Sequence, residues 1–436
     1  MKLRQSPVLL SQLPSPSLGH HRASPPRNRS TTPTQQRCRQ KDATGAKERK
    51  AKGKKKKRER LATSTIVHSD NFTWKIIKLL GSGAFGDVYR VIKEDDADKK
   101  EYAMKTEMAD GNKQDLRLKL EVHVLTLCLN IENPQRKKHF LELFDRGKTK
   151  QFKFLVMTLV GPTLDDIRRN VLGRNYSRST AMQLSHQTLE SLADLHELGY
   201  LHRDIKPQNF AIGLAHCEKT VFILDFGVAR KYTVGNTKEI KTPRVRVRFV
   251  GSVRFASRAC HRYQEQGRKD DMESWLYLVF DMIDSVDGIP WKRFPDRQVL
   301  HMKDKLFSDK LPNCYRIVPK EFKRIVQYID CMMFKEKPDY TYLRHSLNSI
   351  AKEHRIDTKK ELDWVEKGKK KDNSGLHRLG LYRTMTVSTV ASGVAAVAAI
   401  ATTVSVITVV YLVNDINNFY DEAIEELTQF KASEKL

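Results

Sequence analysis

Apolar runs and turn residues alternate from about residue 72 to residue 364, which predicts a folded core over that stretch. Short apolar runs bounded by turn residues predict strands, the first two of which are joined by glycines. The predicted strands are 72–80, 87–92, 102–106 and 152–158, and a helical pattern covers 118–129. Strands dominate the first part and helices the rest, so we expect an α+β domain of two lobes with a cleft between them.

Two further signals predict helices in the second part of the core. Thr163 and Asp166 have the spacing of a capping box, which predicts the start of a helix. Leu189, Leu192 and Leu195 mark one face of a helix that we expect to end near Gly199.

An uncharged stretch rich in Val, Ala, Ile and Thr follows the core at 384–413. Its 30 residues are long enough to cross a bilayer as a helix. Arg378, Arg383 and a lysine cluster precede it and acidic residues follow it, so we expect its amino-terminal side in the cytosol. We predict a single-pass transmembrane helix there and a short tail at 414–436 across the bilayer. A buried helix or a strand is the alternative.

Positive charge is concentrated near the amino terminus. The formal net charge of the chain is +27, and residues 1–60 hold 18 Lys/Arg against three acidic residues. This segment has too little apolar surface to offset the entropy of ordering, so we predict a disordered basic tail at 1–65. An organellar transit peptide is the alternative. A second basic segment at 366–383 predicts a solvated linker.

The basic tail also raises the question of nucleic acid binding. Its run Lys54–Arg58 has no interleaved aromatic residues. Such a run is equally suited to anionic lipid or to nuclear import. We therefore do not expect nucleic acid to be a partner.

A glycine-rich turn links the first two predicted strands. Its sequence is Gly81-Ser82-Gly83-Ala84-Phe85-Gly86. Backbone N–H groups without bulky neighbours can approach the phosphates of ATP, and Val88 is placed to pack on adenine. A dinucleotide-binding turn would enter a helix at once, whereas a strand is predicted here, so the pattern favours ATP.

A lysine and an acid follow at the spacing expected for phosphate binding. Lys105 is predicted to hold the α- and β-phosphates of ATP. Glu121, on the predicted helix 118–129, is the acid expected to fix the Lys105 ammonium. Taken alone, either residue would be assigned to a solvated surface.

Later in the chain, four residues indicate how the phosphate would be transferred. Asp204, in His-Arg-Asp, is the predicted base that orients the attacking hydroxyl, and Lys206 is expected to reach the γ-phosphate. Asn209 and Asp225 are the predicted metal ligands. Their two oxygens suit Mg²⁺.

In this order the motifs resemble those of a eukaryotic protein kinase. Lys206, within the stretch from His202 to Asn209, is similar to the serine/threonine class. Gly251–Ser257 stands where most kinases carry Ala-Pro-Glu and resembles the casein kinase 1 superfamily. Further motifs that resemble it are Gly267–Ser274, Pro290-Trp291 and Lys337–Tyr340, while Asn209–Gly213 and 306–364 resemble its tau-tubulin kinase branch.

The resemblance covers about 72–365 and implies a bilobal kinase domain there, with ATP and Mg²⁺ in the cleft. Met157 would guard the back of the adenine pocket, and Thr158 to Val160 would form the hinge that bonds adenine. Asp271 would brace the catalytic loop. Leu276 stands where many kinases have glycine, a departure that bears on packing.

Basic residues crowd the segment after Asp225. They are Lys231, Lys238, Lys241, Arg244, Arg246, Arg248 and Arg254. Guanidinium groups suit phosphate contacts, so we predict acidic or already phosphorylated Ser/Thr substrates. The superfamily that the chain resembles recognises phosphate at such a site, and Arg254, with Arg244, is predicted to form it. A solvated loop is the alternative.

Three classes of function compete. They are an active serine/threonine kinase, a pseudokinase-like scaffold that binds nucleotide or partners at a membrane, and a nucleic-acid-binding protein. The complete catalytic set favours the first. With the predicted span in membrane lipid, we expect the kinase domain on the cytosolic face; cytoplasm or nucleus is the alternative localisation.

Overall fold

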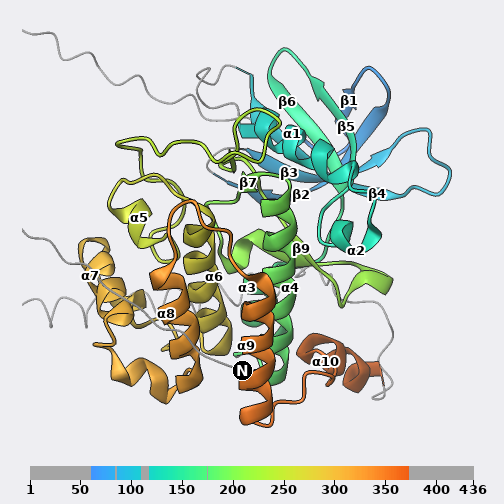
Figure 1. Cartoon of the computed structure of the whole chain (residues 1–436). Helices are drawn as coiled ribbons and strands as arrows, with labels where there is room; N and C mark the ends of the chain where they lie inside the picture. The colour runs from blue at the N-terminus through green and yellow to red at the C-terminus, as the bar shows by residue number, and fades with distance from the viewer. Residues whose placement is uncertain (1–59, 84–85, 110–116, 174, 373–436) are drawn as a thin grey trace, which may run out of the picture. The chain divides into compact units, whose positions relative to one another are not determined.

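The computed structural model describes residues 60–83, 86–109, 117–173 and 175–372. Its first region is an antiparallel sheet of six strands in the order β1-β2-β3-β4-β6-β5. The strands are β1 (Ile66–His68), β2 (Thr73–Ser82), β3 (Asp87–Lys93), β4 (Glu101–Met108), β5 (Leu143–Lys148) and β6 (Phe152–Thr158). Helix α1 (Arg117–Leu129) packs against β5 and β6 (Figure 1).

Alternation along the strands gives the sheet two different faces. On one face Trp74, Tyr89 and Met104 belong to a small apolar core. Because successive side chains point to opposite sides, Val88 and Lys105, which pair across β3 and β4, belong to the other face. The sheet therefore presents these two residues away from its own core.

The second region is built around two long helices, α4 (Arg178–Glu197) and α6 (Arg268–Ile283), which pack against each other. Every residue of α6 from Asp270 to Met282 is buried, as expected for a helix enclosed by protein on all sides. Ser177 caps α4 by accepting a hydrogen bond from the N–H of Thr180. Helix α4 also packs against β7 (Tyr200–Leu201) and β9 (Val221–Ile223).

Shorter elements complete the second region. The helices are α2 (Pro134–Lys137), α3 (Leu164–Asp166), α5 (Arg258–His261), α7 (Asp296–Phe307), α8 (Lys323–Cys331), α9 (Tyr340–Glu353) and α10 (Asp363–Asp372). The strands β7 (Tyr200–Leu201) and β10 (Arg230–Lys231) pair with each other, as do β8 (Phe210–Ile212) and β9 (Val221–Ile223). A short π-helix is η1 (Ile167–Leu172), and the 3₁₀ helices are η2 (Pro207–Asn209), η3 (Ala215–Cys217), η4 (Pro290–Arg293), η5 (Pro312–Arg316) and η6 (Lys320–Phe322).

Most of the predicted elements are confirmed. The four predicted strands correspond to β2, β3, β4 and β6, and the predicted helix 118–129 corresponds to α1. The capping box is present, since Thr163 accepts from the N–H of Asp166 and Asp166 accepts from the N–H of Thr163. Helix α4 ends at Glu197, and Gly199 follows with a left-handed φ of 84°.

The fold extends beyond the predicted core at both ends. Residues 60–65 were predicted to belong to the tail, yet the N–H of Leu61 donates to the Tyr89 hydroxyl and that of Ser64 donates to the carbonyl of Ile76. Helix α10 continues to Asp372, inside the predicted linker 366–383. The Trp364 indole anchors the start of this helix by donating to the carbonyl of Glu218 at 3.0 Å. Local composition does not reveal such long-range contacts.

Several predictions fall on segments outside the described residues. These segments are the tail up to residue 59, the linker from 373 to 383, the predicted span 384–413 and the tail 414–436. Within the part of the chain that the structure describes, no helix is long and apolar enough to cross a membrane.

Candidate active site

The glycine turn joins β2 to β3 as a hairpin. Gly81 pairs with Val88, and Ser82 pairs with Asp87. The chain returns into a strand, as predicted, and this is not the arrangement of a dinucleotide-binding turn. Ala84 and Phe85, at the tip, lie outside the described residues.

Close backbone approach explains one of the glycines. The N–H of Gly83 donates to the carbonyl of Gly86 at 2.9 Å. A Cβ on Gly86 would lie 1.9 Å from the carbonyl oxygen of Thr106 on β4. Any side chain at position 86 would therefore push the turn away from the sheet.

Lys105 connects three elements that are distant in sequence. Its Nζ lies 2.6 Å from Oε2 of Glu121 on α1 and 3.0 Å from Oδ1 of Asp225, just after β9. The Glu121 side chain is only 3% exposed, whereas that of Asp225 is 46% exposed. One carboxylate therefore lies against the lysine from inside the fold, and the other faces open space.

Electrostatics keeps Lys105 and Asp225 charged. Burial on its own lowers the pKa of Lys105, but the carboxylates of Glu121 and Asp225 outweigh it and raise the pKa above its ordinary value. Burial raises the pKa of Asp225, but the Lys105 ammonium outweighs that effect and lowers it. At neutral pH the cleft thus holds an ammonium beside an ionised, accessible carboxylate.

Asp204 lies in the loop between β7 and η2, surrounded by hydrogen-bond donors. Its Oδ2 accepts from Nζ of Lys206 at 2.6 Å and from Nδ2 of Asn209 at 3.2 Å. Its Oδ1 accepts from the Ser252 hydroxyl at 2.9 Å, and Lys206 also donates to that hydroxyl at 3.1 Å. The structure therefore brings together the three residues predicted for catalysis and adds Ser252.

The two predicted metal ligands each retain an oxygen. The Asn209 amide nitrogen is committed to the carbonyl of Asp204 at 2.7 Å, which leaves its Oδ1 as an acceptor. Asp225 uses Oδ1 for Lys105 and for the N–H of Gly227 at 3.2 Å, which leaves Oδ2. The described residues contain no group of three or more His, Cys, Asp or Glu side chains suited to a metal. One amide oxygen and one carboxylate oxygen suit Mg²⁺, which takes its other ligands from phosphate and water.

Asp271 holds the loop that carries Asp204 from behind. Its buried carboxylate accepts from the N–H of His202 at 2.7 Å and from the N–H of Arg203 at 3.0 Å. Arg203 has a φ of 68°, a left-handed conformation that is uncommon outside glycine. The position predicted for a bracing carboxylate therefore contacts the strained part of the loop.

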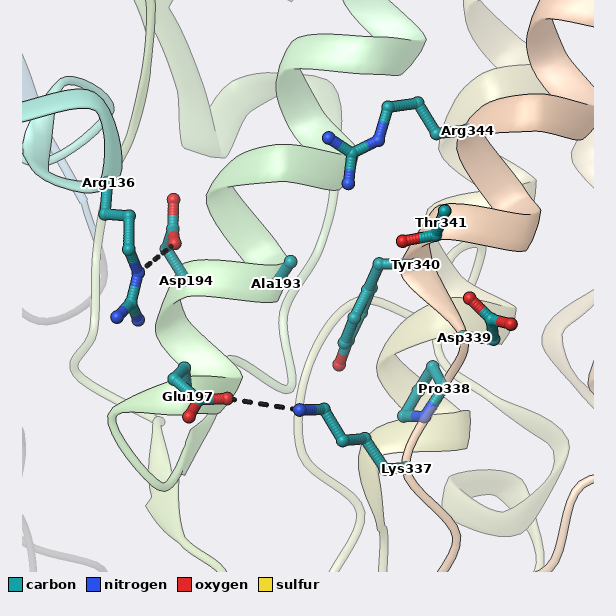
Figure 2. A pocket seen from close by; sticks show the side chains of 10 residues that line it. All are labelled: Arg136, Ala193, Asp194, Glu197, Lys337, Pro338, Asp339, Tyr340, Thr341 and Arg344. Carbon is teal, nitrogen blue, oxygen red and sulfur yellow. Dashed lines mark hydrogen bonds and ion pairs between the residues drawn. The ribbon is translucent and has the colours of Figure 1, made fainter.

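The same carboxylate also contacts α4 and is linked through it to α9. Asp271 contacts Nε2 of His196 at 2.8 Å, and Nδ1 of His196 contacts the Tyr340 hydroxyl at 2.6 Å. Tyr340 lines a pocket of about 600 Å³ together with side chains from α2, α4 and α9, which Figure 2 shows. None of the predicted site residues lines this pocket, so the residues predicted for ATP lie elsewhere.

The predicted hinge begins at the end of β6, and its residue Val160 has backbone groups without hydrogen-bond partners among the described residues. Met157 and Thr158 are half-buried at the end of β6, where they pair with Ala103 and Tyr102 of β4. Among the described residues, neither the N–H nor the carbonyl of Val160 has a hydrogen-bond partner. A donor and an acceptor on one half-buried residue are what a planar base such as adenine can use.

The two arginines predicted to bind phosphate differ in their surroundings. Arg244 donates to both oxygens of Glu265, at 2.5 and 3.1 Å, and Arg230 contacts the same carboxylate at 3.2 Å. Arg254 forms no ion pair with any described residue and lies 6.0 Å from the Phe255 ring centroid. Of these two arginines, Arg254 is therefore the one whose guanidinium has no ion-pair partner among the described residues.

Sequence reasoning missed two residues of this site. Ser252 was noted only as part of a family motif, although its hydroxyl contacts Asp204. Glu265 was not considered, although it is buried between two arginines. An acid within a strongly basic stretch was the signal that could have revealed it.

Comparison with known proteins agrees with this geometry. The protein kinase domain model matches residues 74–338. Putative serine/threonine-protein kinase ZK507.1 of Caenorhabditis elegans is 37% identical over 267 residues, which cover 61% of this chain and 79% of that protein. Serine/threonine-protein kinase spe-6 of the same organism is 34% identical over 301 residues, covering 68% and 76%.

A second family matches the other end of the chain. The model of the nematode cuticle collagen N-terminal domain matches residues 386–435, which lie outside the described residues. The kinase match spans more than half of the chain and includes each motif of the cleft. The chain therefore belongs to the protein kinase family, among its serine/threonine kinases.

Proposed function

We propose that this chain is an active, Mg²⁺- and ATP-dependent serine/threonine kinase of the casein kinase 1 type, similar to the tau-tubulin kinase branch. Its substrates are Ser and Thr hydroxyls in acidic or already phosphorylated proteins. The observation that carries the proposal is the contact of Lys105 with both Glu121 and Asp225, beside an Asp204 that also contacts Lys206 and Asn209. A complete set in contact argues against the pseudokinase-like scaffold.

Each nucleotide-side residue has a role in this proposal. The hairpin from Gly81 to Gly86 covers the phosphates, and Val88 packs on adenine, whose edge bonds the free backbone groups of Val160. Lys105 holds the α- and β-phosphates because Glu121 fixes its ammonium. Asn209 and Asp225 would hold Mg²⁺, which would neutralise phosphate charge.

The transfer itself is an in-line displacement. The substrate hydroxyl oxygen forms a bond to the γ-phosphorus, the bond between that phosphorus and the β–γ bridging oxygen breaks, and ADP leaves. Asp204 orients the hydroxyl and accepts its proton, while Lys206 stabilises the charge on the transferred group. Ser252 keeps Asp204 in place through the bond to Oδ1.

Substrate preference rests on the free guanidinium of Arg254. It lies two residues from Ser252, which contacts the base. Charge-assisted bonds from arginine to phosphate are short and strong, and Arg254 needs no partner exchange to form one. Arg244 is a weaker candidate, because it would first have to release Glu265.

The proposal is tested with the full chain, Mg·ATP and matched Ser peptides that are neutral, acidic or phosphorylated. We expect transfer to all three, with the lowest KM for the phosphorylated peptide. Equal KM values would remove the substrate preference. If none of the three peptides is phosphorylated, the kinase activity is contradicted and the pseudokinase-like scaffold is favoured.

We also propose that residues 384–413 anchor the protein in a membrane as a single span, with the kinase domain in the cytosol. The uncharged run and the basic flank support this proposal, and cytosolic ATP requires that side. The test is alkaline carbonate extraction of the full chain beside a variant without residues 384–436. We expect only the shortened chain to be extracted; extraction of both would favour the cytoplasm or nucleus.

A further inference from the structure

Lys303 of α7 is a lysine in an unusual environment. Its side chain is fully buried, at 0% exposure, whereas lysine is almost never buried without a charged partner. No carboxylate among the described residues forms an ion pair with it. Glu273 attracts it, but the Glu273 oxygens are occupied by Arg258 and by the Tyr277 hydroxyl.

Two backbone carbonyls accept from the Lys303 amino group instead. They are the carbonyl of Val253 at 3.0 Å and the carbonyl of Ala256 at 2.5 Å. Nε2 of His261 lies 3.1 Å from Lys303 Nζ and also 3.1 Å from the carbonyl of Val253. Lys303 and His261 therefore meet at the same carbonyl.

Two of these acceptors lie on either side of Arg254. The carbonyl of Arg254 itself accepts from the Trp291 indole at 2.8 Å. Side chains of α7 and η4 thus hold three of the four carbonyls from residue 253 to residue 256. The backbone of this loop is fixed from inside the protein, while the Arg254 guanidinium remains free.

We propose that Lys303 is a positioning residue for the protein-substrate side of the active site. Its amino group holds the loop 252–256 through the carbonyls of Val253 and Ala256 and thereby places Arg254 for the substrate phosphate and Ser252 for Asp204. This inference rests on the proposed kinase function. Lys303 touches neither substrate nor nucleotide, so its effect is transmitted through the loop backbone.

Stability alone does not account for a buried ammonium here. Replacing buried charged groups by apolar residues of similar volume is often neutral or stabilising. Lys303→Met should therefore fold, but it cannot donate to the two carbonyls. Lys305→Met is the matched control, since Lys305 lies two residues away on α7 and is half-exposed.

The test measures kcat and KM of the full chain for a phosphorylated peptide, its unphosphorylated form and ATP. For Lys303→Met we expect the KM of the phosphorylated peptide to rise about fivefold or more, as for a lost charged hydrogen bond. The KM of ATP should stay within about twofold, and Lys305→Met should match wild type. An unchanged preference for the phosphorylated peptide in folded Lys303→Met, or equal losses for all three substrates, would overturn the inference.

A double-mutant cycle identifies the route of the effect. If Lys303 acts through Arg254, then Lys303→Met should change the phosphorylated-peptide KM little in an Arg254→Ala background. Fully additive effects would contradict that route.

Two further outcomes are distinguishable. If Lys303→Met does not fold, Trp291→Phe is measured instead, because it removes the donor to the Arg254 carbonyl. This variant should raise the KM of the phosphorylated peptide, and an unchanged KM overturns the inference. A wild-type chain without transfer overturns the proposed function.

Discussion

The Ser252 hydroxyl donates to the Asp204 carboxylate at 2.9 Å, across 48 residues of sequence. Lys206 contacts both of them, at 3.1 and 2.6 Å, so the three side chains form a closed set. Ser252 belongs to the loop that carries Arg254. The position of the proposed base therefore depends on the substrate loop as well as on its own loop.

Removal of this hydroxyl should weaken transfer. Ser252→Ala loses both bonds, and we expect roughly a tenfold lower kcat, because hydrogen bonds to charged groups contribute about 1.5–3 kcal/mol. Ser252→Thr keeps a hydroxyl and serves as the control. Steady-state kinetics with one Ser peptide compare the two variants, and equal kcat values would show that the contact has no catalytic role.

The two predicted phosphate-binding arginines should behave differently. Arg254→Ala is expected to raise the KM of a phosphorylated peptide roughly tenfold and to leave that of a neutral peptide unchanged. Added salt should reduce the wild-type preference in the same direction. Arg244→Ala should affect both peptides alike, since Arg244 holds Glu265. A larger loss of preference in Arg244→Ala than in Arg254→Ala would reverse these assignments.

Lys303 should make stability depend on pH. Burial lowers its pKa from 10.5 to about 7, and Glu273 opposes the effect only in part. Between pH 7 and pH 10.5 the unfolded chain therefore binds more protons at this position, so stability rises with pH. The titratable groups that face it include Cys260 and His261 from α5 and Glu273 and Tyr277 from α6.

A difference measurement isolates this contribution. The free energy of unfolding of wild type relative to Lys303→Met should increase by about 2 kcal/mol from pH 7 to pH 9, since each pKa unit corresponds to about 1.4 kcal/mol. Urea unfolding of both proteins at the two pH values provides the measurement. Equal changes in the free energy of unfolding of the two proteins would mean that the pKa of Lys303 is not lowered in the folded protein.

Local patterns were sufficient for four of the six strands of the sheet and for the residues that contact Lys105. Strands β2, β3, β4 and β6 follow from short apolar runs, and helix α1 places Glu121 16 residues beyond Lys105. These motifs have fixed spacing along the chain. The sequence therefore revealed their positions without knowledge of the tertiary contacts.

Other parts of the site depend on contacts that no local pattern encodes. The sequence predicted Arg244 as a phosphate ligand. Its bond to Glu265, 21 residues away, forms only in the folded chain, so the sequence did not reveal that this arginine is already paired. Lys303 was not singled out, because lysines are normally solvated and this one contacts a loop 47 to 50 residues earlier. Buried polar partners of this kind require a structure.

The central claim is that Asp204 and its neighbours transfer phosphate to a Ser or Thr hydroxyl. The most direct measurement is single-turnover formation of phosphoserine, detected by mass spectrometry, with the full chain, Mg·ATP and one acidic Ser peptide. Wild type should phosphorylate the peptide, while Asp204→Asn should be slower by about 10²-fold or more and should still bind ATP. Undiminished phosphoserine formation by Asp204→Asn would contradict the account.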